Sequence, residues 1–206
     1  MNIYFYICLL LAHISISSCS GSSESDMPKV NKKAFLDIKA GDNTLGRIEV
    51  GLFGKIVPKT VQNFYELCQL PQKGYKGTRF FQVLKDFIIM GGDITKNNGH
   101  GGYSIYGDTF EDENYKLKHY GAGWISLANW GKNMNKSIFC ILLKPAPWLD
   151  EKYVVFAKVL KGMEVIKKIE NVEISHGNAP LIDVIIDNCT VEEVDNPFSV
   201  SIENAE

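Results

Sequence analysis

The sequence has no excess of either charge. Its 206 residues include 22 Lys and Arg against 24 Asp and Glu, which gives a formal net charge of −2. This balance gives no electrostatic reason to expect a nucleic acid or an anionic membrane surface as a partner. With 45% hydrophobic and 11% aromatic residues, the composition is that of a globular domain and excludes a wholly disordered chain.

Motifs for common catalytic chemistry are also missing. The chain contains no G-x-S-x-G, no P-loop and no H-E-x-x-H motif, so no serine-hydrolase, phosphate-cradle or zinc-protease signature is present. No C-x-x-C pair occurs and the histidines are scattered, so we predict no zinc site and no cofactor. We interpret His119 and His176 as surface residues, and the acidic run at 111–113 as a solvated loop in preference to a cation site.

The first twenty residues contain no Lys, Arg, Asp or Glu. An apolar run from Ile3 to Ile16 is followed by small residues, an order typical of a secretory signal peptide. The run is short for a membrane-spanning helix, which needs about 20 apolar residues, and no later segment approaches that length. We predict a signal peptide over residues 1–20, cleaved near residues 17–21, and a mature protein in the endoplasmic reticulum lumen or secreted. An uncleaved N-terminal anchor is the alternative.

Three cysteines remain after residue 20, namely Cys68, Cys140 and Cys189. Lone cysteines in apolar runs usually act as small buried hydrophobic residues. We therefore expect no disulfide that the fold requires. Two N-x-S/T sequons begin at Asn135 and Asn188, and both are possible N-glycosylation sites if the chain enters the secretory pathway.

The rest of the chain predicts a β-rich domain. Residues 21–33 are polar and indicate a flexible leader, and residues 34–39 and 45–53 alternate as a β-hairpin does. Pro58 opens a helix to about Leu70. Further strands are expected at 80–90, 124–130, 137–143, 153–159 and 181–186, with a short helix at 163–169. About eight strands and two helices favour a closed barrel or a sandwich over residues 34–190. Residues 191–206 carry five acidic residues and no basic one, as a peripheral acidic tail does.

Ordered motifs across residues 34–190 make the chain resemble a cyclophilin. They are GLFG at 51–54, PKTVQNF at 58–64, YKGTRF at 75–80, GGDIT at 91–95, SIYG at 104–107, FEDEN at 110–114, WLD at 148–150 and VVF at 154–156. Residues 172–198 are similar to the secretory-pathway, B-type cyclophilins. The resemblance implies a mainly β fold, a closed eight-stranded antiparallel β-barrel capped by two α-helices, with a peptide groove on its outer face. It also implies a structural role for the loop at 111–113.

The resemblance further implies cis/trans isomerisation of X-Pro peptide bonds, without metal or cofactor. The barrier is about 18–20 kcal/mol because amide resonance must be broken. In the family an Arg donates to the proline nitrogen, whose lone pair is available only in the twisted peptide, so the contact favours the transition state. Here Gln82 occupies that position. Its amide is shorter and neutral, and charge-assisted hydrogen bonds are about twice as strong as neutral ones.

The other groove positions that the resemblance assigns are partly retained and partly replaced. Retained residues or residue types are Phe87, Ala128, Asn129, Phe139, Trp148 and Leu149, with Asn129 expected to bind the peptide main chain. Replacements are Ile88 for Met, Met90 and Ile138 for Gln, Trp130 for Ala, Cys140 for Phe and Tyr153 for His. The groove is therefore expected to be more apolar than is usual in the family.

These residues predict a weak isomerase that assists protein folding in the secretory pathway. The alternative is a non-catalytic pseudo-isomerase that binds peptides or escorts a secretory client. The expected partners are proline-containing peptides and secretory client proteins, with weakened binding of cyclosporin-type ligands. We expect no nucleic-acid partner, no membrane span in the mature chain, and a monomer.

Overall fold

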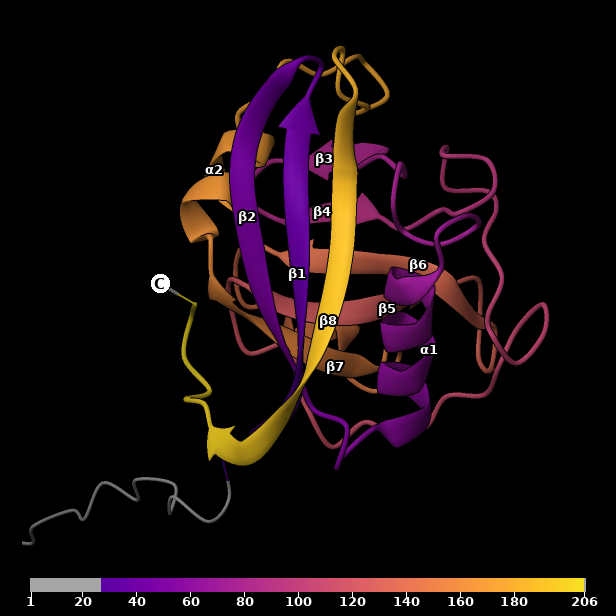
Figure 1. Cartoon of the computed structure of the whole chain (residues 1–206), viewed down its shortest axis with the longest axis vertical. Helices are drawn as coiled ribbons and strands as arrows, with labels where there is room; N and C mark the ends of the chain where they lie inside the picture. Colours follow the sequence, from indigo (N-terminus) through magenta and orange to yellow (C-terminus); the bar gives the residue numbers. More distant parts are fainter. Residues whose placement is uncertain (1–26, 206) are drawn as a thin grey trace, which may run out of the picture.

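The structure is a computed structural model that describes residues 27–205 (Figure 1). The predicted signal peptide and residues 21–26 of the predicted leader lie outside the described residues. Within residues 27–205, no helix combines the length and the apolar character that crossing a membrane would require.

Eight antiparallel strands form one sheet in the order β3-β4-β6-β5-β7-β2-β1-β8. The strands are β1 Lys29–Ala40, β2 Asn43–Leu52, β3 Gln82–Leu84, β4 Ile88–Gly91, β5 Trp124–Asn129, β6 Asn135–Leu142, β7 Val155–Lys161 and β8 Val184–Ser199. The helices are α1 Pro58–Gln69, α2 Met163–Glu170 and the short 3-10 helix η2 Pro147–Leu149. The prediction of a mainly β fold with eight antiparallel strands and two α-helices is confirmed.

The sheet curls into a barrel whose two edge strands do not pair directly. Figure 1 shows β8, β1 and β2 side by side in front of the other five strands, with α1 and α2 on opposite sides. The segment just before β3 connects the edges through backbone hydrogen bonds to β8. Gly77 N–H donates to Ile186 O at 2.7 Å, and Phe80 N–H donates to Val184 O at 2.8 Å.

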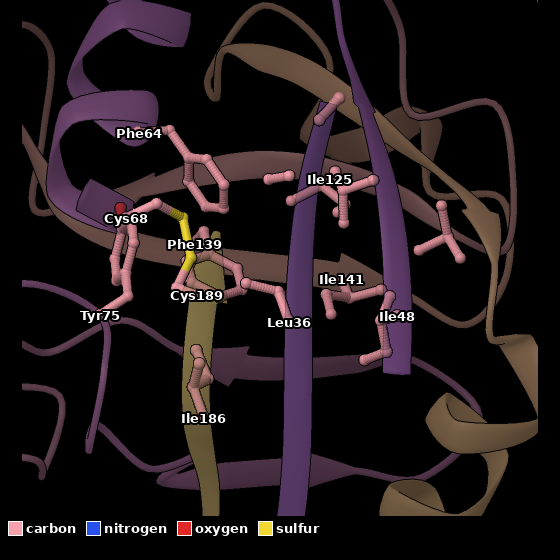
Figure 2. Packing of buried hydrophobic residues seen from close by; sticks show 14 of the residues in the cluster. Leu36, Ile48, Phe64, Cys68, Tyr75, Ile125, Phe139, Ile141, Ile186 and Cys189 are labelled. Atoms are coloured by element: carbon pink, nitrogen blue, oxygen red, sulfur yellow. A yellow bond between two sulfur atoms is a disulfide. The ribbon is translucent and has the colours of Figure 1, made fainter. Parts of the chain in front are cut away.

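Aromatic rings fill the barrel beneath α1 (Figure 2). The apolar stripe predicted for the helix is buried, and the Phe64 ring lies 4.8 Å from that of Tyr75 and 5.5 Å from that of Phe139. The Tyr75 hydroxyl donates to Ser137 O at 2.8 Å, which satisfies its polar atom in the core. Burial in this apolar setting raises the pKa of Tyr75 well above its usual value.

A disulfide joins Cys68 on α1 to Cys189 on β8 (Figure 2). The interpretation of Cys68 and Cys189 as lone buried residues is therefore wrong, and Cys140 is the one free cysteine of the described chain. That the fold does not require this disulfide stays a prediction. The two bonded residues are 121 positions apart in sequence. They meet because the last turn of α1 packs over β8, a contact that local sequence patterns do not contain.

The sheet extends beyond both predicted domain boundaries. β1 begins at Lys29 and pairs there with Ser199 of β8, so the sheet includes residues on both sides of the boundaries expected at 34 and 190. The acidic residues of the predicted tail lie beside lysines of β1, as in the ion pair between Lys32 and Glu193. Residues 200–205 then run back along the barrel, where Ala205 N–H donates to Ala122 O at 2.8 Å. The predicted tail is therefore built into the fold as far as residue 205.

Candidate functional site

The buried carboxylate of Asp93 shapes the loop beside the groove. It accepts five backbone N–H hydrogen bonds of 2.9–3.2 Å, from Thr95, Lys96, Asn98, Gly99 and Gly101. Burial would raise the pKa of Asp93, but these donors outweigh it and lower the pKa to about 2. A Cβ at Gly101 would collide with the Asp93 carboxylate and the Thr95 hydroxyl, so glycine is needed there. The loop at 94–101 is thus held in one conformation.

A cavity of about 460 Å³ opens next to this loop. The loop forms one wall, and residues 177–183 contribute to another. Six residues of the predicted groove line the cavity, namely Gln82, Met90, Ala128, Asn129, Trp130 and Ile138. The structure therefore brings together residues from β3, β4, β5 and β6 that the sequence analysis assigned to one surface.

A row of side chains crosses the outer face of the sheet from Gln82. Gln82 pairs with Met90 across β3 and β4, Met90 pairs with Cys140 on β6, and Cys140 pairs with Ser126 on β5. Paired residues of neighbouring strands project to the same face. Gln82, for which the resemblance implies the catalytic position, therefore shares a face with the predicted floor of the proline pocket.

The aromatic and aliphatic residues of the predicted proline site gather beside Cys140. Ile88 and Cys140 are buried in one apolar cluster, with Phe87, Met90 and Leu149 packed against it. The ring of Trp148, which is 53% exposed, lies 5.8 Å from the ring of Phe87. Tyr153 lines a neighbouring hollow with Asn129 and Trp130.

Phe139 does not belong to this surface. It lies between Ile138 and Cys140 on β6 and is fully buried inside the barrel, in contact with Phe64 and Tyr75. Successive side chains of a strand point to opposite faces. The assignment of three consecutive residues to the groove was therefore wrong at the central one.

A chain of polar contacts, missed by the sequence analysis, runs from the free thiol into the protein. Cys140 Sγ lies 3.2 Å from Ser126 Oγ, which lies 3.1 Å from His119 Nε2, and His119 Nδ1 lies 2.8 Å from Asp150 Oδ1. His119 is only 2% exposed, so its interpretation as a surface residue was wrong. The four residues come from separate segments, and only the fold shows that they meet.

The protonation of this chain follows from its surroundings. Burial lowers the pKa of His119 although the Asp150 carboxylate opposes the shift, and burial raises the pKa of the Cys140 thiol. When neutral His119 donates its Nδ1 proton to Asp150, its Nε2 accepts the Ser126 hydroxyl proton. Ser126 Oγ then accepts the Cys140 thiol. In this arrangement the floor of the groove carries a neutral thiol that donates to Ser126 Oγ, and a neutral thiol is a poor nucleophile.

The amide of Asn129 is used within the protein. Its Nδ2 donates to Lys152 O at 3.0 Å, and its Oδ1 accepts from Gly131 N–H at 3.2 Å. These bonds fix the turn that carries Trp130, whose ring stacks on His100 at 5.7 Å between centroids. A peptide held at Asn129 would therefore meet the Trp130 and His100 rings.

The acidic loop at 111–113 has a structural role, as the resemblance implied. Helix α1 has no side-chain cap of its own. Glu113 supplies one, because its carboxylate accepts the Lys59 and Thr60 backbone N–H groups, each at 2.9 Å. Asp112 accepts from Asn135 Nδ2 at 2.7 Å. Within the described residues, no group of three or more His, Cys, Asp or Glu side chains is placed to hold a metal ion.

The two sequon asparagines differ in environment. Asn135 is fully buried, and its Nδ2 also donates to Phe110 O at 3.2 Å. Asn188 is half-buried on β8 opposite Asp37 and next to the disulfide of Cys189.

Comparison with known proteins agrees with the resemblance to cyclophilins seen in the sequence. The family described as "Cyclophilin type peptidyl-prolyl cis-trans isomerase/CLD" matches residues 35–191. The chain is 42% identical over 188 residues to peptidyl-prolyl cis-trans isomerase D of Saccharomyces cerevisiae, covering 90% of this chain and 84% of that protein. It is also 42% identical over 189 residues to isomerase B of the same organism, covering 88% and 92%.

Proposed function

The chain belongs to the family of cyclophilin-type peptidyl-prolyl cis-trans isomerases, and from this premise we propose that it isomerises X-Pro bonds slowly, in proteins of the secretory pathway. The observation that carries the proposal is the position of Gln82. It lines the cavity beside the groove, on the same sheet face as Met90 and Cys140. It stands where the family places the Arg that donates to the proline nitrogen.

A neutral donor at this position lowers the rate. Losing about 3 kcal/mol of preference for the transition state costs about 100-fold in rate. Arg79 also lines the cavity, but its guanidinium donates to Asn97 O and to Asp183 Oδ1, each at 2.7 Å. Arg79 is therefore already engaged and does not replace the missing charge.

Residual activity can come from the apolar groove. The planar amide is more polar than the twisted one, because resonance separates charge between its oxygen and nitrogen. Surfaces such as Met90, Ile138 and Cys140 displace water from a bound X-Pro bond and so disfavour the planar form relative to the twisted form. We propose this as the source of a slow reaction that needs no cation.

The secretory location has two supports. Residues 1–20 have the charge-free apolar pattern of a signal peptide. The Cys68–Cys189 disulfide suits an oxidising compartment, where such bonds persist. N-terminal sequencing of the mature protein from a eukaryotic host is expected to begin near residues 17–21. Recovery of Met1 or Asn2 would instead support an uncleaved anchor.

An isomerisation assay on a proline tetrapeptide tests the enzymatic proposal. We expect kcat/KM to be about 100-fold below that of a relative with Arg at this position, and still above the uncatalysed rate. Full family activity would refute the proposed weakness. Peptide binding with no acceleration would establish the second candidate, a pseudo-isomerase that holds or escorts a secretory client. The engagement of Arg79 by Asn97 and Asp183 favours this candidate.

A further inference from the structure

We propose that the cavity beside Gln82 binds an uncharged aromatic side chain flanking the proline of a bound peptide, and that Trp130 is the residue that selects it. The inference rests on the proposed function, because it names the substrate class of the same groove. It depends on the shape, the polarity and the rigidity of the cavity.

The cavity has the size and lining of a side-chain pocket. Its volume of about 460 Å³ falls within the range of about 300–1,000 Å³ for small-ligand sites. Met90 and Ile138 contribute apolar surface, and Phe81 forms part of a wall. Phe81 packs so closely on Gly99 that a Cβ there would come within 2.6 Å of the ring. An aromatic side chain can therefore enter between surfaces that are already in place.

Trp130 offers a ring to such a ligand. Its side chain is 59% exposed, and it stacks on His100 with an interplanar angle of 21°. A large aromatic ring left this exposed beside a cavity is typical of a recognition surface. Offset-stacked or edge-to-face contact with Trp130 is available to another aromatic ring and not to an aliphatic side chain.

The two segments that carry the stacked rings of His100 and Trp130 are both fixed by hydrogen bonds. His100 belongs to the loop that the Asp93 carboxylate organises through five backbone hydrogen bonds. Trp130 belongs to the turn fixed by the bonds of Asn129 to Lys152 O and Gly131 N–H. A pocket ordered before binding loses less entropy when the ligand enters.

The polarity of the lining disfavours charged side chains. Arg79 and Asp183 form an ion pair at the rim at 2.7 Å, and the remaining polar side chains include the neutral amides of Gln82, Asn97 and Asn98. A carboxylate or ammonium group in this cavity would lose water without gaining a free partner of opposite charge. The pocket therefore selects an uncharged ring.

A peptide series tests the proposal by binding alone. Hexapeptides with one Pro carry Trp, Leu, Ala or Glu in turn at each position on either side of it, and isothermal titration calorimetry gives Kd. We expect Trp at one position to bind at least about tenfold tighter than Ala, and Glu to bind no tighter than Ala. Trp130→Ala should abolish that gain and Trp130→Phe should keep most of it. The control Leu181→Ala, which removes an exposed apolar side chain near the cavity, should leave the gain unchanged.

The outcomes separate this inference from the function on which it rests. Equal binding of all proline peptides overturns the aromatic pocket and leaves the proposed function intact. A Trp gain that survives in folded Trp130→Ala, with its thermal unfolding unchanged, overturns the role of Trp130. Failure of every proline peptide to bind overturns both proposals.

Discussion

The Cys140 thiol lies 3.2 Å from the Ser126 hydroxyl, on the same outer face of the sheet as Gln82 and Met90. The Ser126 hydroxyl is also within hydrogen-bond distance of the buried His119 ring, whose other nitrogen contacts the Asp150 carboxylate. The resemblance to cyclophilins implies a Phe in the proline pocket at the position of Cys140. The floor of the groove in this protein is therefore a small polarisable group tied to an internal polar chain, in place of an aromatic wall.

Cys140 is expected to react slowly with thiol reagents in the native protein. Burial raises its pKa, and the Ser126 hydroxyl oxygen can accept its proton, so little thiolate is present at neutral pH. Titration of the mature chain with a chromogenic disulfide should find no rapidly reacting thiol when native and one thiol when denatured without reductant. Three thiols on denaturation alone would contradict the disulfide as well.

Loss of the Cys68–Cys189 disulfide is expected to destabilise the protein by about 2–4 kcal/mol without abolishing its fold. The bond joins residues 121 positions apart, and closing a long loop restricts the unfolded chain strongly. The barrel core remains, and a domain of this size buries enough surface to fold. Urea unfolding of the Cys68→Ser, Cys189→Ser double variant measures the change, with Cys140→Ser as the control. Equal midpoints for wild type and double variant would show that the bond adds nothing.

The Asp93 loop should confer an acid-dependent part of the stability. The pKa of Asp93 is about 2 in the folded protein against 3.8 for the free side chain. A lowered pKa means that the stabilisation is present above about pH 4 and is lost as the pH falls from about 4 to about 2. We expect this part to be about 1–2 kcal/mol.

Comparison with Asp93→Asn isolates this contribution from that of other carboxylates. The variant cannot ionise and places an amide among backbone donors, so it should be less stable at pH 7. The difference between it and wild type should shrink between about pH 4 and pH 2 in urea unfolding curves. A difference independent of pH would contradict the assignment.

Asn135 is expected to carry no glycan in the folded protein, although its sequon is intact. The side chain is fully buried and donates to Asp112 Oδ1 and Phe110 O. A sugar on Nδ2 would remove these bonds and force the strand out of the core. Mass spectrometry of protein secreted from a eukaryotic host should find Asn135 unmodified, and a folded form glycosylated there would contradict the structure.

Local sequence patterns predicted the helices and strands that are determined by interactions between residues close together in the chain. The apolar stripe of α1 and its opening at Pro58 need only helical periodicity, and the β1–β2 hairpin needs only alternation around the Gly41 turn. Alternation along β6 also excludes Phe139 from the groove, so this error was avoidable.

What could not be predicted depends on contacts between distant segments. The acidic residues after 190 suggested a peripheral tail, but Glu193 and Glu192 form ion pairs with Lys32 and Lys33 of β1 when β8 pairs alongside. The burial of His119 becomes acceptable only when Ser126 and Asp150 supply its hydrogen bonds. Neither partner can be identified from the residues around His119.

Restoring a positive charge at position 82 alone is not expected to restore an isomerisation rate typical of the family. Gln82→Arg returns the donor, but a donor acts only when the proline lies at hydrogen-bond distance and the peptide is correctly held. Met90 and Ile138 supply no polar anchor, and Cys140 supplies no aromatic wall.

We therefore expect Gln82→Arg to gain less than about tenfold in kcat/KM on a proline tetrapeptide. Adding the substitutions Trp130→Ala, Met90→Gln, Ile138→Gln and Cys140→Phe should gain much more than the sum of the single changes, because groove residues that act as a unit are non-additive. Gln82→Lys is the matched control, since it restores a charge without the planar fork of the guanidinium. If Gln82→Arg alone reached ordinary family activity, the groove would be competent as it stands. The slow rate would then result from one missing cation.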